Sequence, residues 1–79
     1  MYKRIVLETR DENLDTSNLY ENDFVKVSNF KERFFVKIEK VDNNYIFGRI
    51  ANNLVDTKHR IGDKIRFNKQ KVLSIYYDN

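Results

Sequence analysis

Apolar and polar residues alternate in steps of two along most of this chain. In residues 33–41, Phe34, Val36 and Ile38 share one face, and the intervening positions share the other. Because successive side chains of a β-strand point to opposite faces, this spacing predicts a strand with one buried face. The same pattern predicts further short strands over residues 2–8, 23–27, 45–52, 64–67 and 72–77.

Turn-forming residues separate the predicted strands. Residues 42–44 read Asp-Asn-Asn, and both residue types tolerate positive φ, so a hairpin turn is predicted there. Gly62 begins a second turn, and residues 68–71 have the length of one 3₁₀ turn. Gly48 lies inside a predicted strand, where glycine costs stability. We therefore expect a bulge, a bend or a close backbone approach at that position.

Short strands at this spacing are typical of a small β-barrel. The order is strand, loop, long hairpin, irregular loop, short strand, 3₁₀ turn and final strand. The predicted fold is therefore all-β, a small SH3-like five-stranded barrel with an added N-terminal strand. We assign residues 1–22 to an N-terminal strand and polar loop that pack on the barrel, and residues 23–79 to the barrel itself.

Composition narrows the class of protein. The 79 residues contain no Cys, so disulfides and cysteine-ligated zinc are excluded and the fold must be held by packing. No apolar run approaches the ~18 residues of a membrane span, and the N-terminus lacks the apolar region of a signal peptide. We expect a cytoplasmic protein without membrane contact. Asn, Lys, Ile, Phe and Tyr have AT-rich codons and make up 37 residues, which suggests a low-GC genome, including that of a virus or phage.

Three stretches, residues 34–41, 46–52 and 61–67, resemble the family named domain of unknown function 2314, a group of small β-rich bacterial proteins. The tail over residues 72–77 resembles the closing strand of that family. Members usually carry an Asp-Trp pair there, whereas this chain has Ser74 and Ile75. The resemblance covers about residues 23–78. It implies a β-rich fold and no reaction, because the activity of the family is unknown.

Candidate catalytic groups are sparse. His59 is the only histidine, and without cysteine or a second histidine it is a poor transition-metal ligand. The chain has neither a nucleophile elbow nor a Gly-rich phosphate loop. Asp11 with Glu12, and Glu21 with Asp23, flank polar loops, where solvated carboxylates are the rule. We expect a non-catalytic protein with no cofactor, no metal and no small-molecule substrate.

The outward face of the central hairpin is the first candidate binding surface. Its positions are Arg33, Phe35, Lys37, Tyr45, Phe47 and Arg49. The predicted turn places Phe35 and Lys37 near Phe47 and Arg49. Because the hairpin is apolar on both faces, something must cover its outer side. The candidates are residues 1–22, acting through Val6 and Tyr2, a second copy of the chain, or a protein partner.

Positive charge gathers in the second half of the chain. The net charge is +3, but residues 58–71 contain six basic side chains against one acidic side chain. The basic residues are Lys58, Arg60, Lys64, Arg66, Lys69 and Lys71. Such a density attracts polyanions, and aromatic residues between cations provide stacking sites for bases.

Two functions follow from these features. The first is a protein-interaction or structural accessory module, as in a viral or phage particle or its host cytoplasm, that binds a protein partner or forms a homo-oligomer through the hairpin face. The alternative is a nucleic-acid-binding module that uses the basic segment, with Phe35 and Phe47 as stacking groups. The alternative is favoured if Lys64, Arg66 and the hairpin cations lie on one surface.

Overall fold

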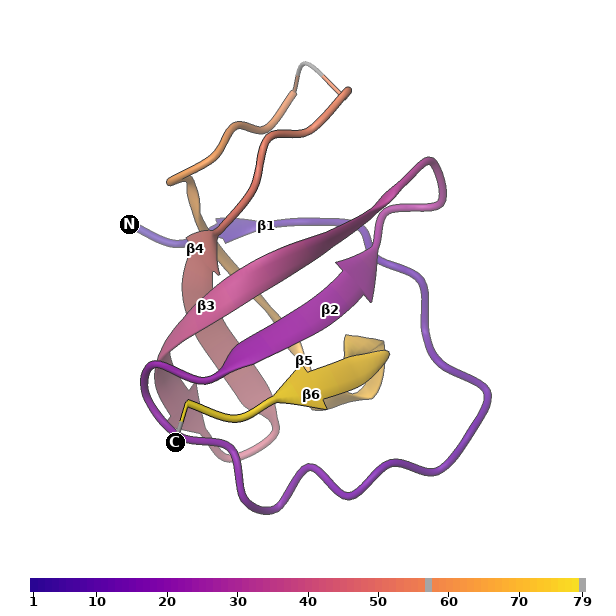
Figure 1. The fold of residues 1–79 in the computed structure, drawn as a ribbon, viewed down its shortest axis with the longest axis vertical. Coiled ribbons are helices and arrows are strands. Elements are labelled where there is room, and N and C mark those ends of the chain that lie inside the picture. The colour runs from indigo at the N-terminus through magenta and orange to yellow at the C-terminus, as the bar shows by residue number, and fades with distance from the viewer. Residues whose placement is uncertain (57, 79) are drawn as a thin grey trace.

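In a computed structural model, which describes residues 1–56 and 58–78, six strands form a single sheet (Figure 1). The elements are β1 (Lys3–Arg4), β2 (Phe24–Ser28), β3 (Arg33–Asp42), β4 (Tyr45–Ile50), β5 (Lys64–Asn68), the 3₁₀ helix η1 (Lys69–Lys71) and β6 (Ser74–Tyr76). The strand order is β1-β5-β4-β3-β2-β6. The predicted all-β class is confirmed. The sheet is not closed, because no pairing among the described residues joins β1 to β6.

Strand β3 is shared between two halves of the sheet. Residues 33–37 of β3 pair with β2 on one side, and residues 36–42 pair with β4 on the other. The register with β4 shifts between Ile38 and Lys40, and Gly48 lies opposite Ile38 at that point. A Cβ atom on Gly48 would approach the Lys37 carbonyl oxygen and come within 2.8 Å of Val36 Cγ1. The predicted bulge and close backbone approach are therefore both present.

The predicted turns are also confirmed. Asn43 adopts a φ of 53° between β3 and β4, so an asparagine supplies the left-handed conformation that the hairpin needs. Gly62 does the same before β5, with a φ of 89°. Helix η1 begins after Asn68, whose side-chain oxygen accepts a hydrogen bond from the Gln70 amide. This bond satisfies a backbone donor at the start of the helix.

The inner face of the curved sheet contains one apolar core. Strands β2 to β5 contribute alternate residues to this core, as the period of two predicts. The fully buried core residues on these strands are Val25, Val27, Phe34, Val36, Ile38, Ile46, Ile50 and Ile65. Leu7, Leu19 and Val72 enter the same core from outside these strands.

The N-terminal segment departs from the prediction. A strand was expected over residues 2–8, but β1 contains only Lys3 and Arg4, paired in parallel with β5. Beyond β1 the chain turns inward, so that Leu7 is buried and the Glu8 amide donates to the Ser28 carbonyl oxygen. Val6 is 80% exposed, so the expectation that it covers the hairpin is wrong.

Arg10 holds the long connection to β2, which curves around the sheet (Figure 1). Its guanidinium donates hydrogen bonds to the carbonyl oxygens of Lys69 at 2.7 Å and Leu14 at 3.2 Å. Asp23, expected to be solvated, is buried instead. Its two carboxylate oxygens accept hydrogen bonds from the amides of Tyr20 and Asp78. Among the described residues, no helix is long and apolar enough to cross a membrane.

Candidate functional site

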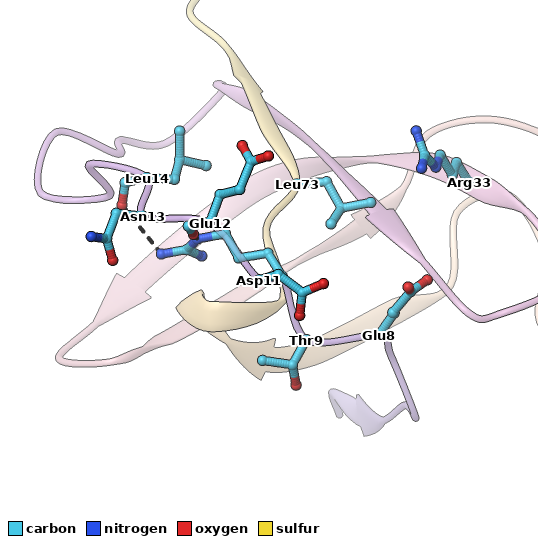
Figure 2. A pocket seen from close by; sticks show the side chains of 9 residues that line it. Glu8, Thr9, Asp11, Glu12, Asn13, Leu14, Arg33 and Leu73 are labelled. Carbon is cyan, nitrogen blue, oxygen red and sulfur yellow. Dashed lines mark hydrogen bonds between the residues drawn. The ribbon is translucent and has the colours of Figure 1, made fainter.

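A hollow of about 380 Å³ lies beside the loop of residues 8–14, with Arg33 and Leu73 on its other side (Figure 2). Its carboxylates, from Glu8, Asp11 and Glu12, do not converge on one point in Figure 2. Among the described residues, no group of three or more His, Asp or Glu side chains could hold a metal ion. Arg10 lines this hollow, and its guanidinium donates hydrogen bonds to backbone carbonyl oxygens. We therefore assign the hollow a structural role.

The hairpin phenylalanines lie in two separate clusters rather than together. Phe47 packs against Tyr2, with ring centroids 5.3 Å apart, and Phe35 packs against Tyr76 at the same distance. The hairpin turn places Lys40, not Lys37, opposite Phe47, and the bulge that follows places Lys37 opposite Arg49. The prediction that Phe35 lies near Phe47 is therefore wrong, because the turn alone already pairs Phe47 with Lys40, whereas the prediction that Lys37 lies near Arg49 is confirmed.

Each phenylalanine is covered by the chain's own residues. Tyr2 covers the edge of Phe47, as expected, and the Lys40 ammonium lies 5.1 Å from the Phe47 ring centroid. On Phe35, the Lys26 ammonium occupies the same kind of position at 5.1 Å. Both phenylalanines are half-buried. The outer face of the hairpin therefore has much less bare apolar surface than its sequence indicates.

A polar network holds Tyr2 in place. The Tyr2 hydroxyl donates to Glu39 Oε1 at 2.6 Å, and Arg49 Nε donates to Glu39 Oε2 at 2.8 Å. The hydrogen bond from Tyr2, supported by the charge of Arg49, lowers the pKa of Glu39. The same bond to the carboxylate raises the pKa of the Tyr2 hydroxyl. Glu39 therefore remains ionised, and its carboxylate neutralises the charge of the Arg49 guanidinium.

Six of the cations on the outer surface of β1, β5, β4 and β3 lie at paired positions on neighbouring strands. We name this surface the basic face and define it as Arg4, Lys37, Lys40, Arg49, Lys64 and Arg66. They form two rows across the strands. In the first row, Lys37 lies opposite Arg49, which lies opposite Lys64. The second row contains Lys40, Phe47, Arg66 and Arg4 in that order.

Most of the charge on the basic face is not neutralised. The structure shows two ion pairs among the described residues, and only the pair between Arg49 and Glu39 involves this face. Like charges directly opposite one another on a sheet are destabilising. The two rows nevertheless place cations at adjacent register positions, with Lys37 next to Arg49 and Arg66 next to Arg4. This arrangement favours an anionic ligand.

The basic segment of residues 58–71 divides into three parts. Lys58 and Arg60 are exposed in the loop before β5, which extends beyond the sheet in Figure 1. The side chains of Lys64 and Arg66 point to the basic face from β5, since Ile65 between them is fully buried. The remaining two lysines, Lys69 and Lys71, belong to η1.

Among the remaining hairpin residues, Arg33 is exposed at the start of β3, and Tyr45 is 46% exposed at the start of β4. Tyr45 points outward beside Asn68 of β5. It is therefore the more open aromatic side chain of the hairpin, in contrast to Phe35 and Phe47. Sequence reasoning included Tyr45 in the hairpin face but named Phe35 and Phe47 as the stacking groups, because exposure could not be ranked without knowing what the two termini cover.

Arg4 also escaped the sequence reading. It belongs to the basic face only because β1 pairs in parallel with β5, and nothing in the local pattern around residue 4 predicts that neighbour. His59, by contrast, is half-buried, and its Nδ1 atom has no hydrogen-bond partner among the described residues.

Comparison of this chain with family models, curated proteins and solved structures finds no match.

Proposed function

We propose that this protein is a non-catalytic module that binds single-stranded nucleic acid through the basic face. One observation carries the proposal: Lys64 and Arg66 of β5 lie in register with the hairpin cations. Lys64 lies opposite Arg49, and Arg66 lies opposite Phe47, on the same outer surface. Neighbouring strands are about 4.8 Å apart, so each row presents its positive charges at short, regular intervals to a phosphate backbone.

We further propose that the sheet is a variant of the SH3-like barrel. The meander from β2 to β5, a 3₁₀ helix after β5 and the return of β6 to pair with β2 all support this assignment. β1 adds to the free side of β5. In this arrangement the curved outer surface of β3, β4 and β5 is the surface open to a ligand. The resemblance to domain of unknown function 2314 remains a prediction alongside this proposal.

The proposal is tested by fluorescence anisotropy with a labelled, mixed-sequence single-stranded DNA over a series of salt concentrations. Each phosphate neutralised on a single strand contributes about −0.7 to the slope of log affinity against log salt. If the basic face contacts about three to five phosphates, the slope is about −2 to −4. Absence of binding at low salt would overturn the proposal.

A matched pair of charge reversals locates the interface. Lys37→Glu changes the first row of the basic face, whereas Arg60→Glu makes the same charge change in the loop before β5. Both side chains are exposed, so neither change disturbs the core. We expect Lys37→Glu to weaken binding about tenfold and Arg60→Glu to have a much smaller effect. Equal losses would show that net charge, rather than this face, governs binding.

A protein-interaction or structural module is the second candidate, and the open sheet favours it. Among the described residues β6 pairs with β2 on one side only, and Tyr76 in β6 and Tyr77 after it are 45% and 51% exposed. A free strand edge with tyrosines beside it suits a partner strand or a second copy of the chain. Light scattering decides between the two candidates, since this one predicts a dimer or larger species that persists at high salt.

A further inference from the structure

A small hollow lies where β5 runs into η1, at the end of the basic face beside β1. Arg4, Arg66 and Lys71 contribute to its lining, together with Tyr45 and Asn68. No acidic side chain is among the described residues that line it. Its volume is about 190 Å³, well above the ~10–15 Å³ that a cavity needs to hold one water. A phosphate group with some of its hydration water therefore fits.

The cations around this hollow are held by the fold. Arg4 and Arg66 are direct neighbours because β1 pairs in parallel with β5 in this register. Lys71 is held on the other side, where its ammonium donates to Thr9 Oγ1 at 2.7 Å. An ammonium has three donors, so Lys71 keeps two for a ligand. Neither arginine forms an ion pair with a described residue.

We propose that this hollow is a nucleotide subsite, in which Arg66, Arg4 and Lys71 bind a phosphate group and Tyr45 stacks against the attached base. Two guanidinium groups and an ammonium match the charge and the hydrogen-bonding capacity of a phosphate. Tyr45 provides an open aromatic ring next to them, and stacking on such a ring tolerates any base. The inference rests on the proposed function and assigns one nucleotide of the bound strand to a defined place.

The phosphate contact and the stacking contact are distinguished by how the DNA affinity of their variants changes with salt concentration. In the anisotropy assay, we expect Arg66→Gln to weaken binding about tenfold at low salt and to make the salt slope shallower, because a phosphate contact is lost. We expect Tyr45→Ala to weaken binding by a similar factor with an unchanged slope, because stacking releases no counterions. Tyr45→Phe preserves the ring and retains affinity. Arg60→Gln, in the loop before β5 and outside both the basic face and the hollow, is the matched control for charge.

The source of the phosphate is distinguished by the ends of the DNA. Oligonucleotides with and without a 5′-phosphate are compared on the wild-type chain and on Arg66→Gln. A terminal phosphate in the hollow predicts a preference for the phosphorylated strand that Arg66→Gln abolishes. An internal phosphodiester predicts equal binding of the two strands, with the same loss for both in the variant. Either result supports the subsite and names its ligand.

A nucleoside 5′-monophosphate tests the hollow without DNA. We expect it to shift the backbone NMR resonances of Arg4, Arg66 and Lys71, and we expect the unphosphorylated nucleoside to shift them much less. If Lys37→Glu weakens DNA binding but Arg66→Gln and Tyr45→Ala behave like Arg60→Gln, the subsite is overturned and the proposed function stands. If the monophosphate shifts these resonances but DNA does not bind, the proposed function fails and the phosphate site stands.

Folding of the variants is checked by thermal unfolding. Arg66→Gln removes one of two adjacent like charges, so its midpoint should equal or exceed that of the wild type. A structural role for Arg66 would lower the midpoint instead. A lowered midpoint together with unchanged nucleotide binding would overturn the subsite.

Discussion

At the residue scale, Gly48 permits the sheet to bend. It lies opposite the point where β3 and β4 change register, and it has no room for a side chain there. Its exclusion of a Cβ is a matter of space, because its φ is not positive. Gly62 presents the opposite case, since it has open space around it and a φ of 89°. Substitution at Gly48 therefore measures the steric cost of a side chain, and substitution at Gly62 measures the conformational cost of a positive φ.

We predict that Gly48→Ala destabilises the protein by about 2–3 kcal/mol, because the backbone of β3 must move to admit the methyl group. Gly62→Ala should cost about 1–2 kcal/mol, the usual cost of left-handed backbone for a residue with a Cβ. Urea unfolding of the two variants measures both values. A larger loss for Gly62→Ala would contradict the close contact at Gly48.

Glu39 makes stability depend on pH. Its pKa is lowered in the folded state, first by the hydrogen bond from Tyr2, so the stabilisation is complete above the ordinary glutamate pKa near 4.3. It is then lost as the pH falls through the lowered folded-state value. We predict that Glu39→Gln costs about 1 kcal/mol at neutral pH, since the site is partly exposed, and flattens the decline between about pH 5 and 3.

The measurement is the thermal midpoint across that pH range. Glu21→Gln is the control, because Glu21 is exposed and forms no side-chain hydrogen bond among the described residues. We expect its pH profile to follow the wild type. A Glu39→Gln variant that does the same would show that the contact with Tyr2 contributes nothing to folding.

At the scale of elements, Arg10 joins the N-terminal loop to η1. Its guanidinium reaches carbonyl oxygens at both, at Leu14 and at Lys69 and Val72. The Lys69 carbonyl oxygen also accepts from the Val72 amide, and a planar cation with several donors can reach several carbonyl oxygens at once. The side chain of Arg10 thus joins two segments that are 59 positions apart in the sequence.

We predict that Arg10→Ala costs about 2 kcal/mol, the typical value for lost hydrogen bonds to a charged group. Arg10→Lys should restore little of this, because one ammonium cannot reach the separated carbonyl groups. Hydrogen exchange of residues 8–14 gives a local measure, and we expect their amides to lose protection in both variants. Full rescue by lysine would show that charge alone holds the loop.

At the scale of the whole molecule, residues 1–22 share the core of the sheet. Leu7 is 3% exposed and Leu19 is 5% exposed, and both pack with the residues of β2 to β5. A chain of this size buries only about 60% of its unfolded surface, so each core residue is a large part of its stability.

We predict that Leu7→Ala destabilises the whole fold by about 2–4 kcal/mol, as expected for a buried leucine. Val6→Ala, one position away on an 80% exposed side chain, should change stability by less than about 0.5 kcal/mol. Chemical denaturation followed by two spectroscopic probes is the measurement. Coincident transitions are expected for Leu7→Ala, since one core unfolds as a unit.

The sequence alone was sufficient for the central strands and their turns. Period-two alternation identified β2 to β5 and their buried faces, because a half-buried strand imposes this pattern directly on its residues. Asp and Asn located the hairpin turn because positive φ is a local property. The short β1 was less predictable, since its end is set by where Leu7 enters the core and not by the residues around it.

The basic face and its hollow were decided by the tertiary structure. The cations were visible in the sequence, but their grouping depends on strand register, on the bulge opposite Gly48 and on the parallel pairing of β1. These features place residues close in space that are far apart in the chain, such as Arg4 and Arg66, which are 62 positions apart. A local pattern records which face a side chain occupies, whereas its neighbours across strands follow from how the whole sheet packs around its core.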